Sequence, residues 1–183
     1  MNKLKQQFVD SYRELKKPNT LVLLALLIAL GIVLDYFGSL QVTENVKIGI
    51  SFVANQLAAA LFGPVAGGIM GGIGDVLKFI IKPTGAFSIL WTLNAIVGPV
   101  IYGIMLYKKK LTFVRIFASK AVVAVIVNIG MHCCWMYLLY GKALMAILPT
   151  KCVQQLIQVP IQSVIFYLFV KALEKTKVFK QLG

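Results

Sequence analysis

Long apolar blocks alternate with short polar, proline-containing or glycine-containing breaks along the chain after residue 19. A helix that crosses a bilayer needs about 20 predominantly apolar residues, and most of these blocks approach or exceed that length. They predict six transmembrane helices, at Thr20–Phe37, Ile48–Phe62, Val65–Ile81, Ala86–Tyr107, Phe113–Tyr140 and Leu148–Leu173. The pattern therefore predicts an all-α membrane protein, a compact six-helix bundle with a polar loop at Gly38–Lys47.

The composition supports this class. Of the 183 residues, 59% are hydrophobic and 14% are charged, whereas a soluble domain is about half apolar and about a quarter charged. The organisation predicted from these blocks is a basic N-terminal segment (1–19), a membrane domain (20–173) and a basic tail (174–183). Residues 1–19 have no signal-peptide pattern, and they predict an amphipathic helix lying on the membrane through Phe8, Tyr12 and Leu15.

The net charge of +13 raises the possibility of nucleic-acid binding. The basic residues are instead divided among several membrane edges, as the positive-inside rule describes for cytoplasmic segments. With the N-terminus inside, Lys108–Lys110, Arg115 and Lys120 also fall on the cytoplasmic side. The outer side then keeps only five of the 19 basic residues, Lys47, Lys78, Lys82, Lys142 and Lys151. This division predicts cytoplasmic termini in a plasma membrane and argues against a nucleic-acid partner.

Glycines recur every four residues in the stretch Leu61–Phe87. Gly63, Gly67 and Gly71 form one series, and Gly68 and Gly72 form another. Small residues at this spacing let helix backbones approach closely in a membrane. The glycines therefore predict a close-packed seam, and Gly63-Pro64 predicts a break between two helices.

Polar groups within the apolar blocks are candidates for a binding pocket. The two intramembrane acids are Asp35 and Asp75, and such groups face a partner or a cavity. For Asp75, both an ion pair with Lys78 and a role in a pocket stay open. The neutral polar residues within apolar runs are Asn55, Asn94, Asn128, His132, Gln154, Gln155 and Gln158.

Aromatic and basic residues lie near the predicted outer face. Phe87, Trp91, Trp135 and Tyr137 fit an interfacial aromatic belt, but together with Asn94 and His132 they also fit a site that stacks on a flat heterocycle. Lys82 and Lys151 either attract a carboxylate or extend to the membrane surface. Taken singly, each aromatic residue fits a membrane anchor better than a binding residue, and the prediction of a binding site rests on the set as a whole.

Catalytic and metal-binding patterns are missing from the sequence. It contains no metalloprotease, nucleophile-elbow or phosphate-loop motif, so energy for active transport would come from an ion gradient or another subunit. His132-Cys133-Cys134 is adjacent in sequence, but neighbours on a helix point about 100° apart, and small apolar side chains inside the bundle are the expectation. We expect no enzyme activity, no metal and no bound cofactor, with a membrane-embedded enzyme and a stand-alone carrier or channel as alternatives.

The chain resembles the substrate-binding S components of energy-coupling factor (ECF) vitamin transporters, most closely the folate-type group. The residues that carry the resemblance are Ala25-Leu-Leu-Ile-Ala29, Val46–Phe52, Leu61–Gly67, Gly74-Asp75, Pro83–Phe87, Tyr140–Leu144, Leu148-Pro149 and Pro160. The resemblance implies capture of a vitamin, folate first, in an outward-facing pocket. It also implies a transmembrane coupling subunit, contacted by Ala25 and Ala29, and two partner ATPases that use the ATP. From the residues alone, these alanines indicate only close packing, internal or with another protein.

One region departs from the folate-type pattern, which has an arginine and then a Lys-Asn pair after the Leu-Pro of the last span. Those positions hold Lys151, Gln154 and Gln155. Lysine keeps the charge of arginine but loses its planar fork. The departure leaves a related pterin or another vitamin as an alternative ligand.

Overall fold

The computed structural model describes residues 3–37, 40–43, 46–82, 88–141 and 144–175. The chain divides into two compact units, residues 1–107 (unit 1) and 108–183 (unit 2). Among the described residues, five helical stretches are long and apolar enough to cross a membrane: Pro18–Phe37, Phe52–Ile81, Ile89–Leu106, Phe113–Leu139 and Leu148–Lys175. The chain is a predominantly helical, multi-pass membrane protein.

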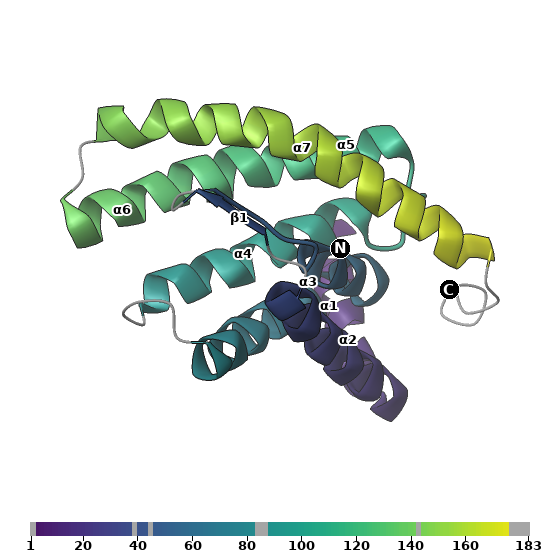
Figure 1. Cartoon of the computed structure of the whole chain (residues 1–183). Helices are drawn as coiled ribbons and strands as arrows, with labels where there is room; N and C mark the ends of the chain where they lie inside the picture. Colours follow the sequence, from purple (N-terminus) through teal and green to yellow (C-terminus); the bar gives the residue numbers. More distant parts are fainter. Residues whose placement is uncertain (1–2, 38–39, 44–45, 83–87, 142–143, 176–183) are drawn as a thin grey trace. The chain divides into compact units, whose positions relative to one another are not determined.

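Unit 1 contains, in chain order, α1 (Lys3–Glu14), α2 (Pro18–Phe37), β1 (Leu40–Thr43), β2 (Val46–Ile48), α3 (Phe52–Ile81) and α4 (Ile89–Leu106) (Figure 1). The two strands pair antiparallel, with Leu40 opposite Ile48. This short ladder lies in the region expected to be a polar loop, and the following helix begins at Phe52 rather than at Ile48. Both expectations were therefore wrong in detail.

Helix α3 reverses direction at Gly63, which has φ 90° and ψ −175°. A Cβ on Gly67 would lie 2.8 Å from the Cβ of Ala59. Residues eight apart in a straight helix are separated by about 12 Å, so the chain folds back between them. The break predicted at Gly63-Pro64 is confirmed, and glycine supplies the positive φ that the turn requires.

Helix α1 closes this reversal through Ser11, which is fully buried. The Ser11 hydroxyl donates to the Phe62 carbonyl at 2.6 Å and accepts from the backbone N–H groups of Val65 and Ala66 at 3.1 and 3.2 Å. Ser11 thereby caps a helix start that lies more than 50 residues further along the chain.

The predicted surface face of α1 is only partly correct. Phe8 and Tyr12 are exposed, which fits contact with a membrane. Leu15 instead packs against the core formed by α2 and α3, which includes Leu24 and Ala54. The placement of α1 on a membrane stays a prediction.

The glycine seam packs α3 against α4, as the four-residue spacing predicted. A Cβ on Gly71 would overlap the carbonyl oxygen of Ala95. A Cβ on Gly68 would press on Val100, and a Cβ on Gly72 would press on Ile96. The two backbones lie so close that a side chain at Gly71 has no space.

Unit 2 is built from two long helical segments. The first runs from Phe113 to Tyr140 as α5 (Phe113–Val123), the π-helix η1 (Ala124–Met131) and α6 (His132–Tyr140), and the second is α7 (Leu144–Lys175). Gly141 ends α6 in the left-handed conformation, with φ 58°, a common helix stop. Helix α7 begins before Leu148, the predicted start.

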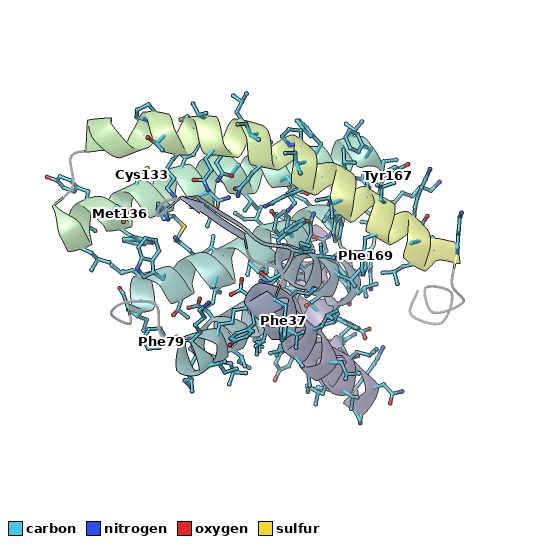
Figure 2. All side chains as sticks on the ribbon, viewed as in Figure 1. Phe37, Phe79, Cys133, Met136, Tyr167 and Phe169 are labelled. Atoms are coloured by element: carbon cyan, nitrogen blue, oxygen red, sulfur yellow. The ribbon has the colours of Figure 1, made fainter. Side chains whose placement is uncertain are left out.

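The two segments of unit 2 run antiparallel beside each other (Figure 1). Phe113 at the start of α5 contacts Tyr167 near the end of α7, with ring centroids 5.7 Å apart. Figure 2 shows Cys133 and Met136 on α6, toward the opposite end of the unit from Tyr167. Cys133 is buried as expected, but Cys134 is exposed and does not lie inside the bundle.

Candidate functional site

A polar seam joins the two segments of unit 2. The Asn128 amide in η1 donates to the Gln155 side-chain oxygen on α7 at 3.0 Å. Gln155, which is 8% exposed, donates in turn to Gln158 at 3.4 Å. These contacts form a small chain of amides inside an otherwise apolar pair of helices.

The helix geometry places these amides together. Asn128 lies in the middle of η1, and a π-helix turn is uncommon and frequently occurs at functional sites. Residues four apart share a face of a helix, so Asn128 follows Lys120 and precedes His132 along the side that faces α7. The seam therefore extends from Lys120 to His132.

Lys120 lies in this seam and not at a membrane edge. It is 3% exposed, and its ammonium donates to the Gln162 side-chain oxygen on α7 at 2.9 Å. The assignment of Lys120 to a cytoplasmic edge was wrong, because the side chain is enclosed between α5 and α7. A buried charge of this kind is costly unless it is hydrogen-bonded, as it is here.

Two of the predicted site residues lie near each other at the start of α7. Lys151 is close enough to His132 and Cys133 on α6 for their charges to influence one another. Trp135 lies three residues after His132, on the same face of the helix, and is partly buried. An ammonium, an imidazole and an indole at one end of the unit can bind an anionic group beside an aromatic surface.

Gln154 and Gln155 differ in their hydrogen bonding. The Gln155 oxygen already accepts from Asn128. The Gln154 side-chain oxygen is buried and has no hydrogen-bond partner among the described residues. Gln154 is thus the amide of this pair with an open acceptor for a ligand.

The predicted site residues of unit 1 lie on α3 and α4. Asp75 accepts a hydrogen bond from the Thr92 hydroxyl at 2.9 Å, a partner that sequence reasoning missed; its pairing with Lys78 stays a prediction. Trp91 and Asn94 lie on α4, partly buried and three residues apart.

The remaining predicted site residues of this unit are Lys82 and Phe87. Lys82 is exposed, with its ammonium 5.5 Å from the ring centroid of Tyr36. This arrangement fits an interfacial cation–π contact. Phe87 lies outside the described residues.

A groove of about 550 Å³ also lies on unit 1, over α3 and α4. Its lining residues are Gly68, Ile69, Gly72, Ile73, Val76, Leu77, Thr92 and Ile96. The single hydroxyl in this lining, on Thr92, already donates to Asp75. The groove offers a polar heterocycle no free hydrogen-bonding group of its own, so we do not place the ligand there.

Ala25 and Ala29 lie on the exposed side of α2. Leu26 and Val22 on the same helix are each 60% exposed. Neither alanine is therefore packed inside unit 1, and their contact with a coupling subunit stays a prediction. Within the described residues, no group of three or more His, Cys, Asp or Glu side chains could hold a metal ion.

A model of the family "ECF transporter, substrate-specific component" matches residues 19–170. The chain belongs to this family. Its members are transporter components rather than enzymes, and the apolar helices described above accord with that role.

Named relatives of this S component agree with the family assignment. It is 34% identical over 169 residues to a folate transporter FolT of Clostridium novyi (strain NT), covering 92% of this chain and 98% of that protein. It is 32% identical over 153 residues to a folate transporter FolT of Leuconostoc mesenteroides, covering 80% and 81%. It also resembles a crystal structure of FolT bound with folic acid, with a TM-score of 0.75 and 30% identity over 82% of this chain and 92% of that one.

Sequence reasoning missed several residues that organise this S component. Asn128 and Gln158 were noted as polar but not assigned to the site, although their position in apolar runs was a usable signal. Thr92 carries no such signal, since a threonine in a membrane helix commonly bonds its own backbone. The role of Ser11 depends on a contact between distant parts of the chain.

Proposed function

We propose that this chain is the folate-binding S component of an ECF importer. The observation that carries the proposal is the likeness to FolT bound with folic acid, at a TM-score of 0.75 and 30% identity. The two FolT relatives, each matched over at least four-fifths of its length, support the same ligand.

In this proposal, the α6–α7 end of unit 2 binds the anionic part of folate. Lys151 supplies the positive charge, and His132 supplies a hydrogen bond beside it. Gln154 offers an open acceptor, and Trp135 offers an aromatic surface. Lysine in place of the arginine typical of the folate-type pattern keeps the charge and gives up bidentate geometry.

The proposed topology has six membrane passes and both termini in the cytoplasm. The reversal at Gly63 divides α3 into residues 52–62 and 64–81, which raises the five apolar helical stretches to six passes. The first part rises only about 16 Å, and β1 and β2 precede it at the proposed outer face. When Lys120 is left out of the count of basic residues at membrane edges, the remaining ones still favour cytoplasmic termini.

The proposed partners are a transmembrane coupling subunit and two ATPases in a bacterial plasma membrane. The exposed Ala25 and Ala29 on α2 would pack against the coupling subunit, because small residues four apart allow close helix contact. The chain has no phosphate-binding loop, so the ATPases would hydrolyse the ATP. We propose no cofactor for this chain itself.

Uptake into proteoliposomes tests the proposal. Liposomes that contain this chain with its coupling subunit and ATPases should accumulate folic acid only with internal ATP, and liposomes with this chain alone should not. Gradient-driven uptake by the chain alone would instead establish a stand-alone carrier. Lys151, Gln154 and Gln155 differ from the folate-type pattern, and this difference makes a related pterin the second candidate ligand. The same uptake assay tests that candidate by asking whether the pterin competes with folic acid.

A further inference from the structure

Helix α1 is held beside the membrane domain by its two neighbours in unit 1. Only residues 15–17 separate it from α2, and the Glu14 carboxylate accepts from the Lys17 ammonium at 2.8 Å across that turn. Ser11 bonds to backbone groups on both sides of the reversal of α3. The start of one apolar helical stretch and the turn between the two proposed passes of another both lie at a membrane surface. Helix α1 therefore lies at that surface.

A stripe of apolar side chains runs along one flank of α1. Leu4, Phe8 and Tyr12 follow one another at four-residue spacing, so they share a face of the helix. They are 54%, 38% and 56% exposed. From the helical repeat, the three lie about 20°, 60° and 100° from the buried Ser11, all in the same direction. The stripe thus begins beside the contact with α3 and faces sideways, toward whatever surrounds the unit at the membrane surface.

Basic side chains lie next to this stripe. Lys5 and Arg13 lie about 120° and 200° from Ser11 in the same direction around the helix. The Lys16 ammonium is 5.2 Å from the ring centroid of Tyr12. All three basic side chains are exposed. The flank that carries the apolar stripe thus also carries three positive charges.

Both acidic residues of α1 lie on the opposite flank. Asp10 and Glu14 are about 100° and 60° from Ser11 in the other direction around the helix. The Glu14 carboxylate accepts from the Lys17 ammonium and, at 3.5 Å, from the Thr20 hydroxyl. The acidic charges of α1 are therefore kept away from the flank on which the exposed cations lie.

An apolar stripe beside basic residues is typical of a helix that lies in the plane of a membrane surface. Anionic headgroups attract each nearby lysine or arginine, and this attraction falls off within a Debye length. A nucleic acid or an acidic soluble protein would use the charges but leave the apolar stripe in water. An anionic lipid matches both parts, because its acyl chains cover the stripe and its headgroup faces the cations.

We propose that this flank of α1 binds anionic lipids of the leaflet at the proposed cytoplasmic surface. The residues of the α1 flank are Leu4, Lys5, Phe8, Tyr12, Arg13 and Lys16. This interaction is separate from the capture of a vitamin and does not depend on which vitamin is bound. Because Ser11 caps the reversal of α3 from the same helix, lipid bound to α1 holds that cap in place. Anionic lipid should therefore stabilise the folded chain.

Fluorescence quenching at one position measures lipid contact with the α1 flank. Tyr12→Trp, combined with Trp91→Phe and Trp135→Phe, places the only indole of the chain on this flank. The full chain is reconstituted in vesicles of equal parts phosphatidylcholine and phosphatidylglycerol, with bromine on the acyl chains of one lipid or the other. Quenching of the indole by each brominated lipid gives the relative affinity of the flank for the two headgroups.

Two triple variants of this protein test the basic residues. Lys5→Gln, Arg13→Gln and Lys16→Gln together remove the three cations of the α1 flank. The matched control replaces Lys108–Lys110 by glutamine, because these three lysines are also exposed but lie outside α1. Melting temperatures are measured for each protein in the mixed vesicles and in phosphatidylcholine alone.

The expected result is a preference for the anionic lipid that depends on the α1 cations. Phosphatidylglycerol should bind at the indole about tenfold more strongly than phosphatidylcholine, since each of the three cations adds to the attraction. The preference should fall close to one in the α1 triple variant and should weaken with added salt, but it should stay unchanged in the control. Phosphatidylglycerol should also raise the melting temperature less in the α1 triple variant than in the control.

Three results would overturn the inference. Equal quenching by the two brominated lipids would show that the α1 flank does not distinguish their headgroups. An equal loss of preference in both triple variants would assign the preference to the net charge of the chain rather than to α1. Quenching by neither lipid would place the flank away from acyl chains and leave it for a protein partner, such as the proposed coupling subunit.

Discussion

Replacing Ser11 by alanine removes the cap on the reversal of α3. The Ser11 hydroxyl makes three hydrogen bonds across the break, one to the Phe62 carbonyl and two from the backbone N–H groups of Val65 and Ala66. Alanine keeps the Cβ and deletes only the oxygen. The variant therefore isolates these three bonds from the packing of α1.

The expected cost follows from the number of groups left without a partner. Replacing a serine cap by alanine costs about 1 kcal/mol for one helix start. Here two N–H groups and one carbonyl lose their partner in a fully buried position, and we expect a total loss of about 2–3 kcal/mol. For a chain of this size, that loss lowers the melting temperature by about 5–10 °C.

Thermal unfolding of the purified chain in detergent measures this effect. Ser88→Ala is the matched control, because Ser88 precedes α4 but makes no side-chain cap hydrogen bond. It should shift the melting temperature by less than about 2 °C. Equal melting temperatures for the two variants would refute the assignment of Ser11 as the cap.

Three further predictions concern packing, the polar seam and the proposed partner. Gly71→Ala should destabilise the chain by about 1–3 kcal/mol, because its Cβ would overlap α4. Gly74→Ala is the control and should not destabilise it, because a Cβ there meets nothing within 4 Å. Equal thermal stability of the two variants would contradict the close packing of α3 against α4. Asn128→Leu should cost about 1–2 kcal/mol by leaving its buried amide partner on α7 unpaired, and an unchanged melting temperature would exclude that pairing. Ala25→Trp combined with Ala29→Trp should abolish folic acid uptake by the complete transporter without changing folic acid binding, and loss of binding would place these residues in internal packing instead.

The main helices and the break at Gly63-Pro64 were predictable because they depend on local residue types. Apolar blocks of sufficient length select membrane-spanning helices, and a proline inside such a block favours a break because it lacks the backbone N–H. The rule is not general, since Gly98-Pro99 lies within the continuous helix α4. The glycine seam was predictable for the same reason, since its four-residue spacing is visible in the sequence. These features do not require knowledge of which helix is the neighbour.

The strands β1 and β2 also had a local signal that the prediction did not use. Leu40, Val42, Val46 and Ile48 alternate with polar residues, a pattern typical of strands. The region was assigned to a loop because it is polar overall. Period-two alternation over seven residues was the better guide.

Contacts between distant residues could not be predicted from sequence patterns. Ser11 becomes a cap only because α1 packs on the reversal of α3. Lys120 was assigned to a membrane edge because its charge suggested exposure, but α7 places Gln162 beside it.

Equilibrium binding of folic acid to the purified chain tests the central proposal most directly. The account predicts one folic acid per chain with a Kd below about 1 μM, which corresponds to a binding free energy more favourable than about −8 kcal/mol, and no displacement by other B vitamins at the same concentration. Absence of folic acid binding below that concentration, or displacement by an unrelated vitamin, would contradict the proposal that this S component captures folate.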